Sequence, residues 1–213
     1  MEQKRPIPAG LRGDIIHLFS PRGTHDGRPT PLQAFERIVT RPGPLALAFH
    51  RVSHTLWRRG LHLTAELIWR ISYLVTGADI HPAAEIGGGL RIAHTSGVVI
   101  GKGARVGSDV TILPGVVVGG AEIRQSDGSR VYGFPEIGDG TELSTGAKVL
   151  GPIHIGRHCR VGANVVLSRD VGDNTVLTEG QERRALTDRI EELENRIAAL
   201  EARESKHVPG RDE

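Results

Sequence analysis

The feature that most constrains this chain is an aliphatic residue that recurs every six positions from residue 80 onward. In order, these positions are Ile80, Ile86, Ile92, Ile100, Val106, Ile112, Val118, Ile137, Leu143, Val149, Ile155, Val161 and Leu167. Neither a strand of period two alone nor a helix of 3.6 residues per turn explains a period of six. The period predicts stacked triangular coils of three short strands each, whose aliphatic residues bury a continuous column along the axis.

The composition agrees with a narrow aliphatic interior. Aromatic residues make up 4% of the chain, and there are 28 glycines. Glycine often follows the aliphatic position, where it tolerates the close approach of backbones at a tight corner. We therefore predict a mainly β fold, a parallel β-helix of hexapeptide repeats over residues 77–178.

Other segments follow different patterns. Residues 1–30 lack apolar periodicity and are interpreted as an arm, whereas residues 31–76 carry helical spacing, with Gly60 separating two helices. Near the C-terminus, residues 181–204 predict a coiled-coil helix whose seam steps by four and three: Leu186, Ile190, Leu193, Ile197 and Leu200. Its RIEELE and RIAALE segments resemble a motif of parallel three-stranded coiled coils, although Ile and Leu at these positions generally favour two strands. The alternative is a helix folded back on its own domain.

Two irregularities interrupt the period, and such places in a regular scaffold often carry function. The step from Ile92 to Ile100 takes eight residues and contains AHTSGVV. Between Val118 and Ile137, residues 120–135 are polar and glycine-rich, and we interpret them as an extruded loop.

Charge and cysteine content restrict the function classes. Lys and Arg number 27 against 25 Asp and Glu, so no dense basic patch suggests nucleic acid as a partner. No apolar run is long enough to span a membrane. The single cysteine excludes an intrachain disulfide framework and, with no signal peptide in MEQKRPIPAG, favours a cytoplasmic location.

Two segments outside the simple repeat are distinctive: the helical stretch RPGPLALAFHRVSHTLWRRG and the stretch GADIHPAAEIGGGLRIAHTSGVVIGKGA. With them, the sequence from Arg41 to Val176 resembles serine acetyltransferase and its close hexapeptide acyltransferase relatives, and the second stretch is similar to the family's DIHPAA and DH.TG.VIG signature. It implies a left-handed β-helix, a homotrimer and acetyl-CoA as co-substrate, with no metal. These are the family's properties, not results of the spacing argument.

The resemblance also implies catalytic residues. His94 corresponds to the family's general base and Asp79 to the carboxylate that orients it. A hydroxyl needs such a base to attack a thioester, and imidazole serves at neutral pH when a carboxylate fixes its tautomer. For acetyl-CoA, the resemblance implies Gly120, Thr145, Arg160 and Ala163. Direct transfer is expected, because Cys159 occupies an inward position of its repeat.

The acceptor-binding residues depart from the family pattern. Ala93 replaces the Asp before the catalytic His, and Gly133 and Phe134 replace an Arg-His pair. An amino acid requires a carboxylate for its ammonium and a cation for its carboxylate, and both are missing at these positions. We therefore expect the acceptor hydroxyl to belong to a sugar or other small molecule, bound by Ala93, Tyr132 and Phe134.

Further expectations and alternatives remain. The chain ends RDE instead of the family's terminal Ile, so binding to cysteine synthase is not expected. A genuine serine O-acetyltransferase of cysteine biosynthesis and a non-catalytic trimeric scaffold are the main alternatives. A zinc hydratase of the same fold is a weaker one, with His81, His94, His154 and His158 as candidate ligands.

Overall fold

The computed structural model describes residues 31–124, 128–180, 187 and 190–198. The chain divides into two compact units, one ending at Leu177 and the other beginning at Thr178. Within the described ranges, no helix is both long and apolar enough to cross a lipid bilayer.

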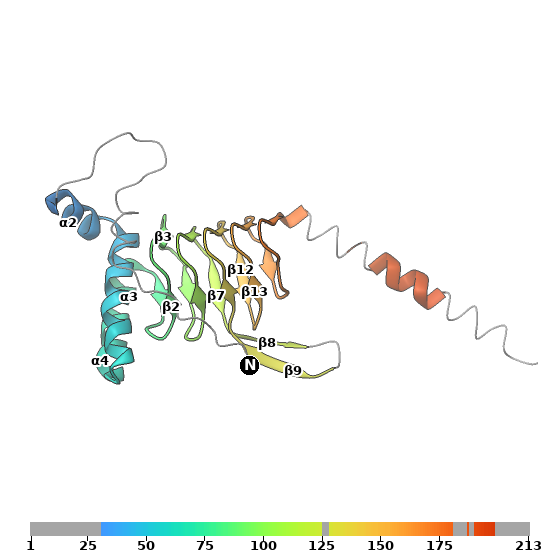
Figure 1. The fold of residues 1–213 in the computed structure, drawn as a ribbon, viewed down its shortest axis with the longest axis horizontal. Helices are drawn as coiled ribbons and strands as arrows, with labels where there is room; N and C mark the ends of the chain where they lie inside the picture. Colours follow the sequence, from blue (N-terminus) through green and yellow to red (C-terminus); the bar gives the residue numbers. More distant parts are fainter. Residues whose placement is uncertain (1–30, 125–127, 181–186, 188–189, 199–213) are drawn as a thin grey trace, which may run out of the picture. The chain divides into compact units, whose positions relative to one another are not determined.

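From residue 31, where the described part of the first unit starts, the chain forms helices α2 (Pro31–Thr40), α3 (Pro42–Arg58) and α4 (His62–Thr76) (Figure 1). Gly60, at a φ of +81°, lies in the short connection between α3 and α4, where a side chain would strain the backbone. Helix α4 ends at Gly77, whose left-handed conformation lets its amide donate to the Tyr73 carbonyl. The β region starts two residues later.

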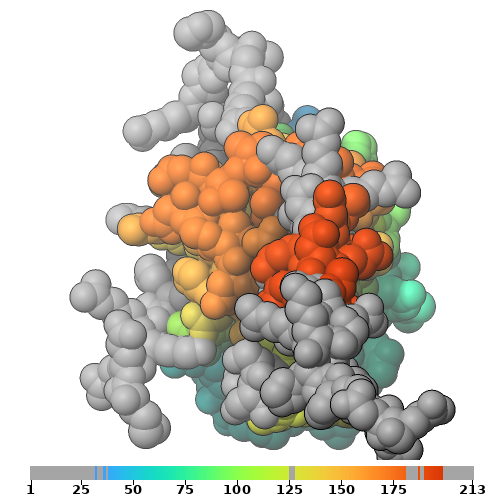
Figure 2. All heavy atoms as spheres, turned by 90° about the vertical axis from the view of Figure 1, so that its right-hand side faces the viewer, coloured from blue at the N-terminus to red at the C-terminus, as the bar shows by residue number. Residues whose placement is uncertain are grey.

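Short strands follow, and most belong to three parallel sheets that form the faces of a prism (Figure 1). Face A holds β1 (Asp79–Ile80), β4 (Val99–Ile100), β7 (Val117–Gly119), β12 (Lys148–Leu150) and β15 (Val166–Leu167). Face B holds β2 (Glu85–Ile86), β5 (Arg105–Val106), β10 (Glu136–Ile137) and β13 (His154–Ile155). Face C holds β3 (Arg91–Ile92), β6 (Thr111–Ile112), β11 (Glu142–Leu143), β14 (Arg160–Val161) and β16 (Val176–Leu177). The last coils are the orange region of Figure 2.

The pairing register records each irregularity of the sequence. Val99 pairs with Val117, an offset of 18 residues, which is three repeats of six. Asp79 pairs with Val99, an offset of 20, because the eight-residue step lies between them. Across the extruded segment the offset rises to 31, as in the pair of Arg105 with Glu136. The extra residues of both irregularities therefore lie outside the repeat, and the same aliphatic positions face inward before and after them.

The extruded segment is an antiparallel hairpin of β8 (Ala121–Arg124) and β9 (Arg130–Gly133). All thirteen aliphatic positions of the repeat are buried, and Ile100, Val106 and Ile112 are fully enclosed. Cys159 is buried in the same column, as its position in the repeat predicts. The period of six therefore defines the core.

Helix α3 lies across the end of the prism formed by the first coil. Its Arg51 guanidinium donates to the carbonyls of Ile86 and Gly87, at 2.6 Å each. Ala46 and Leu47 of the same helix are buried in the aliphatic column. The helix thereby closes the column that the first coil would otherwise leave exposed to water.

In the second unit, residue 187 and residues 190–198 are helical, and Ile190, Leu193 and Ile197 are exposed. Leu186 and Leu200 lie outside the described residues, as does the predicted arm of residues 1–30. The coiled coil therefore stays a prediction.

Candidate active site

The eight-residue step forms a corner of the prism. We call the edge that joins face C to face A the CA corner; it comprises residues 93–98, 113–116, 144–147 and 162–165. His94 and Ala93 are exposed there, while Thr95 is buried and its hydroxyl donates to the carbonyl of Thr76 at the end of α4. The two extra residues thus anchor the corner to α4 and present His94 to solvent.

Three of the residues expected to bind acetyl-CoA lie on or beside the same edge. Thr145 and Ala163 are exposed in successive layers of the CA corner, and the amide of Asn164 donates to the Thr145 carbonyl at 2.9 Å. Arg160 is exposed at the start of β14 on face C, which leads into this corner. The CA corner therefore carries His94, Thr145 and Ala163, and Arg160 lies on the strand that leads into it.

Asp79 begins β1 on face A, next to the CA corner, and is half-buried. Its carboxylate oxygen accepts a hydrogen bond of 2.9 Å from the indole nitrogen of Trp69 on α4. Among the described residues, this is the side-chain bond that the Asp79 carboxylate makes, and the structure shows none between Asp79 and His94. From its spacing, Trp69 is expected only to pack the helices onto the next domain, and no pattern in the sequence predicts its bond to Asp79.

His81, two residues after Asp79, has a lowered pKa. Burial lowers its pKa and the Lys102 ammonium lowers it further, whereas Glu66 and Asp79 partly oppose the shift. Its Nδ1 accepts a hydrogen bond of 3.0 Å from the backbone amide of Ala83, and the rings of Trp57 and Trp69 contact the imidazole ring. This environment supports a packing role for His81.

The remaining predicted residues lie at a different edge. We call it the AB corner; it joins face A to face B and comprises residues 81–84, 101–104, 120–135 and 151–153. The Phe134 ring covers Gly103 and Gly120, leaving no room for a Cβ at either glycine, and Tyr132 packs edge-on against Phe134 at 5.5 Å. Within one chain, Tyr132, Phe134 and Gly120 are therefore separated from Ala93 and His94, contrary to the expectation that Ala93 and the two aromatics form one pocket.

Over the described ranges, no three His, Cys, Asp or Glu side chains are grouped so that they could hold a metal ion. His154 is on face B and His158 follows in the corner between faces B and C. One chain thus does not assemble the zinc site considered from the sequence.

Comparison with known proteins identifies the relatives of this chain. The family model described as bacterial transferase hexapeptide (six repeats) matches residues 134–169. The serine acetyltransferase of Mycobacterium tuberculosis is 42% identical over 167 residues, covering 78% of this chain and 68% of that protein.

Solved structures of serine acetyltransferases also match this chain. Serine acetyltransferase 1 of Entamoeba histolytica, in complex with L-cysteine, matches with a TM-score of 0.64 and 32% identity over 79% of this chain and 61% of that one. A serine acetyltransferase in complex with CoA matches with a TM-score of 0.55 and 32% identity, covering 63% and 54%. This chain thus spans less than two thirds of these solved chains. Together with the hexapeptide model, they support a left-handed β-helix.

These relatives overturn one expectation. Because the curated relatives are named serine acetyltransferases and a matched structure carries L-cysteine, the inference of a sugar acceptor was wrong. It rested on the residues at a few motif positions, and a missing contact at one position can be supplied by another element of the fold. Identity over most of the chain is the stronger evidence, and by it the chain belongs to the serine acetyltransferase family of acyltransferases.

Proposed function

We propose that this protein transfers the acetyl group of acetyl-CoA to the hydroxyl of L-serine, with His94 as general base. The observation that carries the proposal is the position of His94, exposed at the CA corner by the eight-residue step, in a chain 42% identical to a serine acetyltransferase.

The chemistry proceeds by direct transfer. A ring nitrogen of His94 takes the proton of the serine hydroxyl as its oxygen attacks the acetyl carbonyl carbon. The carbon–sulfur bond then breaks, and the proton passes from His94 to the CoA sulfur. Cys159 takes no part as an acetyl carrier, because it is buried and its thiol donates to the Gly172 carbonyl at 3.0 Å.

Asp79 is proposed to favour the imidazolium that forms in this step. Its carboxylate is fixed by Trp69 on one side, and it begins the strand beside the corner that carries His94. An oriented carboxylate stabilises the developing positive charge through space and selects the tautomer of the base.

Acetyl-CoA is proposed to lie along the CA corner, against Thr145, Ala163 and Arg160. A matched structure that contains CoA supports this co-substrate.

A second copy of the chain is needed to bring the AB corner to this edge, because within one chain the two corners are separate. The AB corner carries Gly120, Tyr132 and Phe134. We therefore propose a homotrimer with its sites between protomers, extended by a three-stranded parallel coiled coil of the C-terminal helix, whose Ile190, Leu193 and Ile197 are exposed in a single chain.

The test is thiol release from acetyl-CoA in the presence of L-serine. His94→Ala should lower the rate by roughly 10² to 10⁴-fold, the usual contribution of a general base. His154→Ala is the matched control, because His154 is also exposed but lies on face B. If the wild-type protein releases no CoA with serine, or if both variants lose activity equally, the proposal fails.

A further inference from the structure

The direction of α3 across the end of the prism brings its first residue to the catalytic corner. Near its C-terminal end, His54 Nδ1 lies 2.8 Å from the Pro82 carbonyl at the AB corner, and the Trp57 ring contacts His81 there. At its start, Gly43 packs so closely on Ile92 that a Cβ would collide with the Ile92 carbonyl oxygen. Ile92 ends β3 and leads directly into the CA corner.

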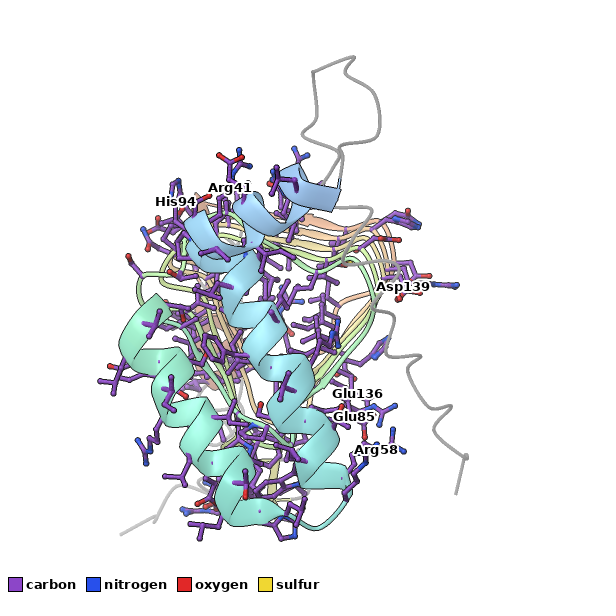
Figure 3. The ribbon with its side chains drawn as sticks, turned by 90° about the vertical axis from the view of Figure 1, so that its left-hand side faces the viewer. Arg41, Arg58, Glu85, His94, Glu136 and Asp139 are labelled. Atoms are coloured by element: carbon purple, nitrogen blue, oxygen red, sulfur yellow. The ribbon has the colours of Figure 1, made fainter. Side chains whose placement is uncertain are left out.

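Arg41 precedes this contact by two residues, and His94 follows it by two. Figure 3 shows Arg41 and His94 at the same corner of the prism, while Arg58 lies at the other end of α3. The Arg41 backbone is fixed, because its carbonyl accepts the Leu45 amide at 3.2 Å and the rings of Pro42 and Pro44 restrict the helix start. The backbone from which the Arg41 guanidinium extends is thus held at the corner that carries His94 of the same protomer.

The Arg41 side chain is exposed, and within the described part of the chain no carboxylate pairs with it. A bidentate guanidinium is well suited to bind a carboxylate, and a charge-assisted pair is stronger than a neutral hydrogen bond. The proposed acceptor, L-serine, presents one carboxylate two bonds from the carbon that bears its hydroxyl. The site requires a cation within reach of His94, and Gly133 and Phe134, at the AB corner, provide none.

We propose that Arg41 binds the carboxylate of the amino-acid acceptor and so determines that the acceptor is an amino acid. This inference rests on the proposed function. Arg41 would hold the carboxylate while the hydroxyl, at the other end of the small substrate, meets His94. The acceptor cation would thereby come from the helix that closes the prism instead of from the loop after β9.

The experiment compares L-serine with L-serinamide, which keeps the hydroxyl and the ammonium but lacks the carboxylate. In the full-length protein, Arg41→Ala should lower kcat/KM for L-serine by about 10- to 100-fold, mostly through KM, and leave the KM for acetyl-CoA unchanged. For L-serinamide the same variant should stay within about twofold of wild type, because no charge pair is lost. Arg41→Lys keeps the positive charge but lacks the planar guanidinium. Its kcat/KM for L-serine should therefore lie between those of wild type and Arg41→Ala.

Arg58→Ala is the matched control, since it removes the same charge from the opposite end of the same helix. It should leave the preference for serine over serinamide intact. An equal loss on both substrates, or no loss on either, would overturn the role of Arg41. If Arg41→Ala does not fold, an Arg41→Lys variant with unchanged preference would overturn it too. Wild-type protein that acetylates neither substrate would instead refute the proposed function, and the role of Arg41 with it.

Discussion

His50 is a titratable side chain that lies buried in the first unit. It is 2% exposed on α3, and neither ring nitrogen makes a hydrogen bond of good geometry. Burial, followed by the charges of Arg51 and His54, lowers its pKa from 6.5 to about 3, which the nearby Ala84 backbone opposes only in part. His50 therefore stays neutral in the folded protein at any pH near neutrality.

The folding stability should depend on pH through this residue. Between pH 6.5 and 3 the unfolded chain binds a proton at His50 and the folded chain does not, so the free energy of unfolding falls as the pH falls. The contribution is fully present above pH 6.5 and declines by about 1.4 kcal/mol per pH unit below it. From pH 7 to 5 this amounts to about 2 kcal/mol.

Urea denaturation of wild type and His50→Leu at both pH values measures the effect. The difference between the free energies of unfolding at pH 7 and pH 5 should be smaller in the variant, because leucine cannot take up a proton when the chain unfolds. The same pH dependence in both would show that His50 is not responsible.

At the scale of elements, the placement of α3 depends on the contact of Gly43, which has no side chain, with Ile92. Gly43 meets the Ile92 backbone, which cannot rotate away as a flexible side chain would. Gly43→Ala should therefore shift the start of α3 or strain it, at a cost on the order of 1–3 kcal/mol. Because this end of α3 lies beside His94, the KM for serine should also rise.

Thermal denaturation and serine kinetics of Gly43→Ala test this expectation. Gly172→Ala is the control, because a Cβ at Gly172 has no atom within 4 Å. Equal melting temperatures of the two variants would mean that the start of α3 can move without cost.

At the scale of the whole molecule, the proposed trimer makes the C-terminal seam testable. Replacing both Ile190 and Ile197 with Asp should weaken the assembly, because charges would be buried between the three helices. Ala198→Asp is the control: it adds a charge to the same helix at an exposed residue outside the seam, and it should leave the assembly unchanged. Native mass spectrometry at low micromolar concentration reads out the number of chains; an unchanged trimer in the seam variant would exclude the coiled coil as a stabilising contact.

The sequence alone determined the interior of the molecule. The period of six is local, and each buried aliphatic residue needs only its neighbours in adjacent coils to be placed, so Ile100 and Leu143 were predictable without coordinates. The eight-residue step was equally visible, and with it the candidate base His94. The polar segment at 120–135 was predicted to leave the prism, and it does so as a hairpin.

Only the tertiary structure decided which residues share an edge. Tyr132 and Ala93 fall at different corners because three faces alternate along the chain, and Trp69 reaches Asp79 because α4 packs back on the first coil. The acceptor was predicted wrongly because the sequence argument considered the residues of a few motif positions only. A side chain that binds the acceptor can come from any element that reaches the site. Arg41 lies beside His94 because Gly43 lets the start of α3 pack on Ile92, a contact between residues far apart in the sequence that no local pattern encodes.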